Sequence, residues 1–197
     1  MAAIGGCLFI LLAIAFLAVV WAIWRYNNLI GLKNQVINGW KQIDVQLKRR
    51  HDLIPNLVSA VRGEMQFEQD TLEKVIAARN GAVAARGVAD AAEKENALTQ
   101  TLSRLFALAE NYPTLKANEN VKSLMEELAS TENRIGFARQ FYNDIATRFN
   151  TAQQIFPDSF IAQAFKFQPV ELFELKDESE RAVPKVDLST RSDRTQS

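Results

Sequence analysis

The stretch LIGLKNQVINGWKQIDVQL, residues 29–47, decides the fold. Its apolar side chains recur at intervals of three or four residues, which is the spacing of one helix face packed against another helix. The positions are Leu29, Leu32, Val36, Trp40, Ile43 and Leu47. A β-strand would instead place an apolar residue at every second position. The sequence therefore predicts an all-α domain that begins with this helix.

The residues before this stretch form an apolar segment, because Met1 to Trp24 contains no charged side chain. A helix rises about 1.5 Å per residue, so this segment can cross a hydrocarbon core of about 30 Å. It ends in the candidate membrane-interface residues Trp21, Trp24, Arg25 and Tyr26, whose side chains favour the headgroup level. No basic residue precedes the apolar run, which favours a retained anchor over residues 1–25 and not a cleaved signal peptide.

The orientation of the anchor is predicted from the basic residues beside it. Arg25, Lys33 and Lys41 follow the apolar segment, whereas only the terminal amine precedes it. Lys and Arg are retained on the cytoplasmic side, so we expect a short external N-terminus and a cytoplasmic main domain. Because the apolar stripe resumes at Leu29, the membrane helix is expected to continue through Tyr26 into this domain without a flexible linker.

Downstream, the apolar stripe continues in register as far as Val75, but Pro55 interrupts it. A proline in a helix interior removes one hydrogen bond and breaks or kinks the helix. Asp52 stands three residues earlier, where its carboxylate could cap a new helix. We therefore expect a turn near His51 and a second helix from Leu53 to Ala85, with one long kinked helix as the alternative.

The rest of the bundle follows from two further segments. A glycine-punctuated stretch from Arg79 to Ala92 predicts a helix end and a connection, and Pro113 ends the third helix. The fourth helix begins after Asn118 and keeps the three-four spacing as far as Phe149. The prediction is an antiparallel four-helix bundle with long helices over residues 26–155.

A short aromatic-rich segment, residues 156–175, follows the bundle and contains five phenylalanines. We expect these rings to pack on the bundle, and any rings that it cannot cover favour self-association into a homo-oligomer. The candidate oligomerisation residues are Phe156, Phe160, Phe165 and Phe167. Residues 176–197 are polar and charged and contain no aromatic side chain, so we expect a disordered tail.

The sequence offers little material for catalysis. It contains one His and one Cys, which excludes most catalysis based on histidine or cysteine. No metal-ligand spacing, Walker sequence or dinucleotide fingerprint is present, so we expect no catalytic residue, no cofactor and no metal. The 23 basic and 23 acidic residues balance, which argues against nucleic acid as a partner. The protein is therefore predicted not to be an enzyme.

One charged cluster, Lys48-Arg49-Arg50-His51-Asp52, is the candidate partner-binding site. In one interpretation its cations complement the negative end of the first helix dipole while Asp52 caps the next helix. In the other, Arg49 and Arg50 each bind a carboxylate of an acidic partner in a bidentate manner.

Polar residues also interrupt the apolar face of the fourth helix at Thr131 and Glu132. Such residues usually fix helix register or find hydrogen-bond partners inside a bundle. A ligand pocket lined by Glu132 is the alternative.

The chain resembles the LemA family in two blocks. The first runs from Trp40 to Arg50 and from Asp52 to Val58, with Tyr26 to Leu29 and Thr71 to Glu73 extending it. The second comprises Tyr112-Pro113, Lys116 to Asn118, Thr131 to Ile135 and Phe137 to Asp144. His51 stands where the family usually has tyrosine, and Gly136 stands where a residue such as alanine is expected.

The resemblance covers roughly residues 1–175 and implies a bacterial source, one N-terminal membrane helix with an external N-terminus, and an antiparallel four-helix bundle. It implies no well-established biochemical activity. Our interpretation is a non-enzymatic scaffold or adaptor in the bacterial inner membrane, which self-associates and presents its bundle to an unknown membrane protein. The alternative is a regulatory or sensory subunit of a membrane protease or transporter. Membrane lipid is a further expected partner.

Overall fold

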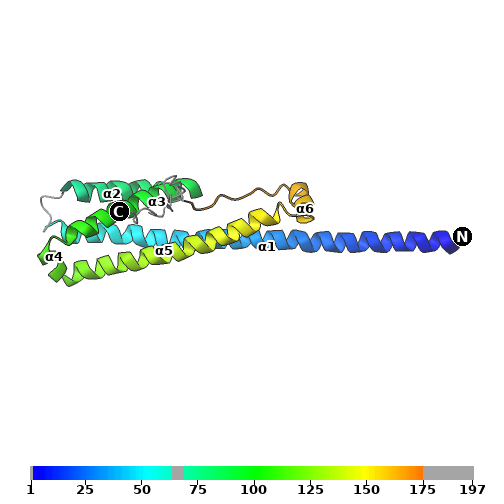
Figure 1. The fold of residues 1–197 in the computed structure, drawn as a ribbon, viewed down its shortest axis with the longest axis horizontal. Helices are drawn as coiled ribbons and strands as arrows, with labels where there is room; N and C mark the ends of the chain where they lie inside the picture. Colours follow the sequence, from blue (N-terminus) through cyan, green and yellow to red (C-terminus); the bar gives the residue numbers. More distant parts are fainter. Residues whose placement is uncertain (1, 64–68, 175–197) are drawn as a thin grey trace, which may run out of the picture.

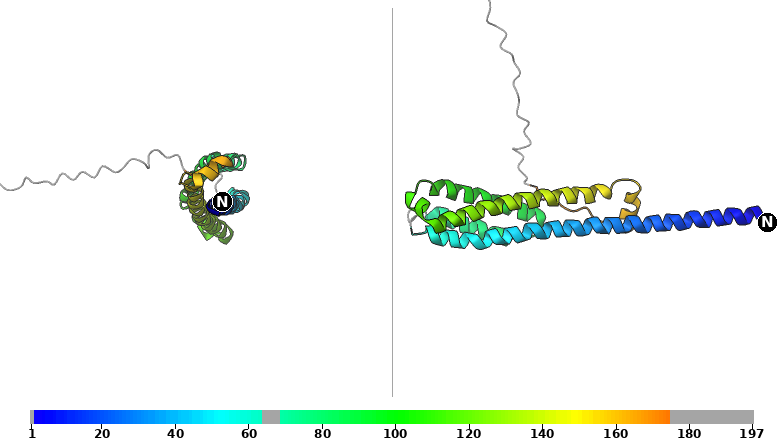
Figure 2. Two further views of the ribbon diagram at one scale, coloured as in Figure 1. Left: turned by 90° about the vertical axis from the view of Figure 1, so that its right-hand side faces the viewer. Right: turned by 90° about the horizontal axis from the view of Figure 1, so that it is seen from below.

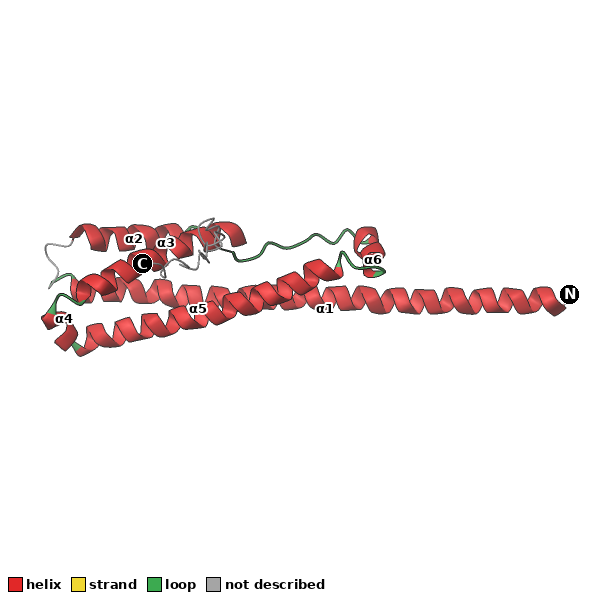
Figure 3. Ribbon diagram, viewed as in Figure 1, coloured by secondary structure: helices red, strands yellow, loops and turns green. Residues whose placement is uncertain are grey.

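The computed structural model describes residues 2–63 and 69–174, and within these ranges the regular secondary structure is helical throughout (Figure 3). The helices are α1 (Ala2–Val61), α2 (Gln69–Val83), α3 (Val88–Ala109), α4 (Pro113–Ala117), α5 (Glu119–Ala152) and α6 (Asp158–Ala164). The all-α expectation is confirmed. The predicted tail, residues 176–197, lies outside the described residues.

Helix α1 consists of an exposed apolar part and a part that packs in the bundle. Its 60 residues would extend about 90 Å at 1.5 Å per residue. The N-terminal part is long and apolar enough to cross a membrane, and its apolar side chains from Leu8 onward are exposed. The buried stripe begins at Leu29. Figures 1 and 2 show this part of α1 projecting alone beyond the bundle, with no linker between the two.

The predicted turn near His51, with a second helix from Leu53 to Ala85, is wrong. Helix α1 continues through Pro55 to Val61. Pro55 has no backbone N–H to donate to the carbonyl oxygen of His51, four residues earlier. The Nε of Arg79 on α2 donates to that oxygen over 3.1 Å instead. Because the freed acceptor finds a partner on another helix, the proline is tolerated, and Asp52 lies exposed within α1 and caps no new helix.

The long helices α1, α2, α3 and α5 alternate in direction along the chain (Figure 1). Helix α5 packs along α1, and α2 packs on α3 over the half of α1 distal from its N-terminus. Helix α5 begins directly after Asn118, as predicted, and the side chain of Asn118 caps it by accepting hydrogen bonds from the amides of Asn120 and Val121. The connection predicted between Arg79 and Ala92 is only four residues long, 84–87, and Gly87 adopts a φ of 82° there.

Two apolar clusters form the core. The distal cluster is centred on Ile54, Leu98 and Leu128, and the proximal cluster, nearer the N-terminus of α1, contains Ile43, Ile135 and Tyr142. Helices α1, α3 and α5 contribute to both clusters, and each carries one buried polar residue between the two clusters. These are Arg50 on α1, Glu95 on α3 and Thr131 on α5.

An extended segment, residues 167–174, covers α1 and α5 where α2 and α3 have ended (Figure 3). The side-chain amide of Asn150 donates to the carbonyl oxygen of Val170 and accepts from its N–H, both over 2.8 Å. Asn143 binds the backbone of Phe173 in the same way, over 3.1 and 2.8 Å. Two helical turns and three extended residues both span about 10 Å, so the two amides fix the register of the segment.

This segment brings two of the phenylalanines into the core, as expected. Phe173 is buried, and the Phe167 ring lies 6.2 Å from that of Phe149 between centroids.

We predict that replacing Arg79 with methionine lowers the free energy of unfolding by about 1–3 kcal/mol, because the carbonyl oxygen of His51 loses its donor. Urea denaturation of the full chain in detergent, followed by circular dichroism, measures the change. In a Pro55→Ala background the restored backbone amide serves the same oxygen, so Arg79→Met should cost less there. An equal loss in both backgrounds would contradict the role assigned to Arg79.

Candidate functional site: a buried charged layer and two exposed aromatic surfaces

Arg50 lies at the centre of the bundle with none of its side chain exposed. One terminal nitrogen, Nη1, donates to Thr99 Oγ1 over 2.9 Å and to the carboxylate of Glu132. The other, Nη2, donates to the carboxylate of Glu95. Burial lowers the pKa of Arg50, and the charge of Glu132 opposes this effect. One guanidinium therefore connects α1, α3 and α5.

The carboxylate of Glu95 is shared, because the Nε2 of His51 lies 2.7 Å from its second oxygen. Burial, together with the charges of Arg50 and Arg79, lowers the pKa of His51 to about 4, although Asp52 and Asp44 act in the opposite direction. His51 is therefore neutral at pH 7 and donates from Nε2 to Glu95. Thr99 Oγ1 completes the network by donating to the other oxygen of Glu132 over 3.2 Å.

We call Arg50, His51, Glu95, Thr99 and Glu132 the charged layer, and their interactions are those of a structural network that holds helices together. Its cation is matched by two carboxylates, and its hydroxyl and imidazole groups are engaged in hydrogen bonds. Among the residues that the structure describes, no group of three or more His, Cys, Asp or Glu side chains could hold a metal ion. A cavity of about 500 Å³ opens beside His51, where Trp40, Asp44 and Arg79 line it.

The structure divides the predicted partner-binding cluster. Arg50 and His51 point inward to Glu95, whereas Lys48, Arg49 and Asp52 are exposed. The Nη2 of Arg49 lies 2.6 Å from the Glu127 carboxylate of α5. A carboxylate of a partner could reach Arg50 only if the bundle opened, so the docking interpretation retains only the exposed residues.

Arg50 and Glu132 could be identified from the sequence, but Glu95 and Thr99, which bind Arg50, and Arg79, which binds the backbone of His51, could not. These three residues lie on α2 and α3, where spacing alone does not predict which side chains face the bundle. Glu95 and Thr99 are four residues apart, so they share one face of α3, but many exposed pairs share this pattern. Glu132 binds Arg50 and Thr99, as the hydrogen-bonding interpretation predicts.

A groove between α1 and α5 is the first exposed aromatic surface. Phe137 and Phe141 of α5 and Val45 of α1 line it together with Lys41 and Arg134, and its volume is about 580 Å³. The sequence analysis did not single out this groove. The available signal was the spacing of Phe137 and Phe141, which are four residues apart and lie off the buried stripe of α5.

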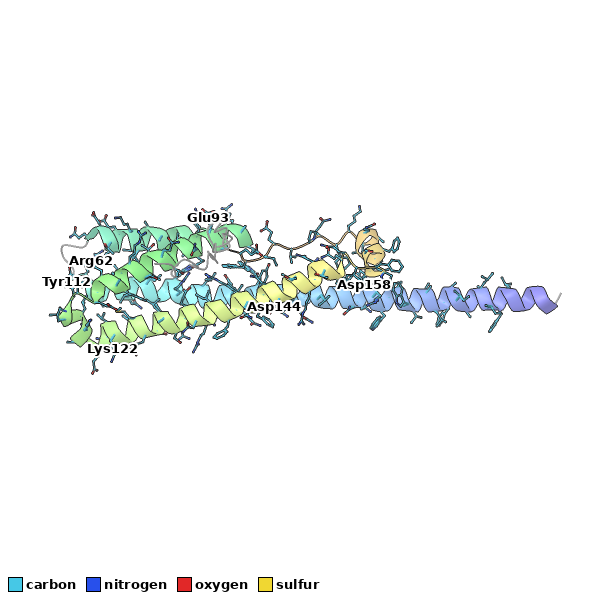
Figure 4. All side chains as sticks on the ribbon, viewed as in Figure 1. Arg62, Glu93, Tyr112, Lys122, Asp144 and Asp158 are labelled. Atoms are coloured by element: carbon cyan, nitrogen blue, oxygen red, sulfur yellow. The ribbon has the colours of Figure 1, made fainter. Side chains whose placement is uncertain are left out.

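The second aromatic surface lies at the end of the apolar segment. The Arg25 guanidinium lies 5.8 Å from the ring centre of Trp21 and 5.0 Å from that of Trp24. Its Nε forms an ion pair with Asp158 of α6 at 3.0 Å. The Tyr26 ring lies 4.6 Å from that of Phe165. The four predicted interface residues therefore gather where α6 contacts α1, close to Asp158, which Figure 4 labels.

The candidate oligomerisation residues fall into two groups. Phe156, Phe160 and Phe165 are exposed around α6. Phe167 is half-buried and packs on the proximal cluster, so it contributes to the core.

The family model and one of the similar proteins carry the same family name. The family model described as "LemA family" matches residues 39–188. Protein LemA of Metamycoplasma hominis is 26% identical over 187 residues, which cover 93% of this chain and 81% of that protein. Magnetosome protein MamQ 1 of Paramagnetospirillum magneticum is 24% identical over a match that covers 85% of this chain and 70% of that protein. Magnetosome protein MamQ of Magnetospirillum gryphiswaldense is 25% identical over a match that covers 85% of this chain and 72% of that protein.

Arg50→Met is predicted to lower the free energy of unfolding by about 3–5 kcal/mol, because it leaves the Glu95 carboxylate buried without its cation. Chemical denaturation of the full chain in detergent reports the loss. The matched control is the double variant Arg50→Met/Glu95→Met, which removes both charges and should recover much of the stability. If the double variant is no more stable than the single one, the ion pair is not the source of the loss.

His51 makes stability depend on pH. Its pKa is about 4 in the folded chain against 6.5 ordinarily, so between these values the unfolded chain binds a proton that the folded chain does not. Stability therefore rises with pH across this window, with a contribution from His51 of about 1–3 kcal/mol.

The measurement is the difference between the native chain and His51→Gln, which keeps a hydrogen-bond donor but does not titrate. We expect a shallower rise with pH for His51→Gln. Parallel profiles for the two chains would show that His51 does not contribute.

Proposed function

This chain belongs to the LemA family, and we propose that it acts as a non-enzymatic, membrane-anchored scaffold that holds a helical bundle rigidly upright on the membrane. The observation that carries this proposal is the continuity of α1, which passes from the apolar segment into the bundle without a linker. A flexible tether would let the domain sample many orientations, whereas a continuous helix fixes one. The buried Arg50 network supports the same role, because it locks α3 and α5 onto that helix.

The surface that the scaffold presents is the groove between α1 and α5. Its lining is mostly apolar, and its two charged lining residues, Lys41 and Arg134, are both basic. An amphipathic helix lays its apolar face into such a groove, and acidic residues beside that face would pair with the two cations. We therefore propose that the occupant is an acidic amphipathic helix of another envelope protein.

Self-association and location complete the proposal. Copies anchored in one membrane are concentrated and aligned, which favours even weak contacts between them. The basic residues after the apolar segment support a bacterial inner-membrane protein with an external N-terminus and a cytoplasmic bundle.

The test is photocrosslinking in intact cells from p-benzoylphenylalanine placed at position 137. We expect adducts whose crosslinked peptides, identified by mass spectrometry, are acidic and amphipathic. Position 83 on α2 is the control, because Val83 is also exposed but lies outside the groove, and it should give none of these adducts. Adducts of the chain with itself at position 137 would instead make a second copy the occupant.

The same probe tests the rigid mount. A glycine- and serine-rich insertion after Arg25 uncouples the bundle from the anchor, and we expect the adducts at position 137 to fall several-fold. If the adducts persist unchanged, the continuity of α1 is not required and the scaffold proposal fails.

A further inference from the structure

We propose that α6 is a second membrane contact, with the side chains of Phe156 and Phe160, and the exposed face of Phe165, inserted into the bilayer surface beside the anchor. This inference rests on the proposed anchoring by α1 and assigns a lipid-binding surface to a part of the chain outside the spanning segment.

The first argument is position. The Nε of Arg25 and the Oδ1 of Asp158 are 3.0 Å apart, and the Tyr26 ring contacts Phe165. Asp158 is buried against α1 (Figure 4). These contacts hold α6 beside the last residues of the apolar segment, where Figure 1 also places it. The depth of α6 is therefore set by α1 and not by a free loop.

The second argument is exposure. Phe156 is 74% exposed, Phe160 is 65% exposed and Phe165 is 59% exposed. The rings of Phe156 and Phe160 contact one another at 5.8 Å between centroids, so they form one patch. Phe165 follows at the end of the same short helix. Large rings exposed around one short helix are unfavourable in water and mark a surface that another apolar phase covers.

The third argument identifies that phase. Trp21 and Trp24 mark the headgroup level on α1, because indole rings collect at the interface. Arg25 contacts both rings and also pairs with Asp158, so the phenylalanine patch shares their level. The bilayer is adjacent to this level in every anchored copy, whereas a second copy is adjacent only after association. An interfacial helix with an apolar face buried among the acyl chains fits this arrangement.

The experiment uses the full chain in a Cys7→Ser background, reconstituted into vesicles of phosphatidylethanolamine and phosphatidylglycerol. Spin labels are attached at Phe156→Cys or Phe160→Cys, and collisions with oxygen and with a water-soluble nickel chelate are compared. Phe137→Cys is the matched control, because Phe137 is also 74% exposed but lies far along the bundle. Two labelling positions are used so that the test survives if one variant does not fold.

We expect the ratio of oxygen to nickel collisions to be several-fold higher at positions 156 and 160 than at position 137. Equal ratios at all three positions overturn the inference. Spin–spin broadening at positions 156 and 160 that disappears on dilution with unlabelled chain also overturns it, because it identifies a second copy as the occupant.

Flotation of the vesicles on a sucrose gradient separates this inference from the proposed anchoring. A chain that fails to float with the vesicles overturns the anchoring and the inference together. A chain that floats but keeps its labels at positions 156 and 160 in water overturns the inference alone.

Discussion

The ion pairs of Arg50 are the interaction on which the arrangement of the bundle depends. A buried guanidinium is costly unless carboxylates surround it, and here one comes from α3 and one from α5. Any slip of either helix would separate a charge from its partner, whereas the apolar clusters on either side could repack after a slip. The charged layer therefore specifies the register of the three helices, while the two apolar clusters supply most of the stability.

The continuity of α1 depends on a compensation of a different kind. Pro55 should end a helix, yet the carbonyl oxygen that it leaves free is met by a side chain from α2. The hydrogen bonds of Arg50 and this compensation lie within two turns of one another on α1; the first require α3 and α5 to be in place, and the second requires α2. The long helix in this region is thus a product of the tertiary structure as much as of its own sequence.

The sequence predicts well those features that are local or periodic. The apolar segment, the stripe from Leu29, the start of α5 after Asn118 and the all-α class each follow from spacing or from a single residue type. The continuation through Pro55 could not be predicted, because the donor that permits it lies 24 residues away on another helix. Arg50 was noticed as part of a cluster, but its inward facing depends on Glu95, whose burial no short-range pattern indicates. The amides of Asn143 and Asn150 were missed for the same reason, since their partner is an extended backbone.

The pairing of Arg25 with Asp158 has a mechanical meaning. From Arg25 to Val61, α1 extends about 54 Å, so the bundle is a lever whose pivot lies near this ion pair. A sideways force on the tip becomes a torque at the pivot, which one helix alone would resist only by tilting. Helix α6 lies beside the pivot and transmits that torque as a force on the surface next to it. A load on the distal end would in this way be felt as pressure beside the anchor.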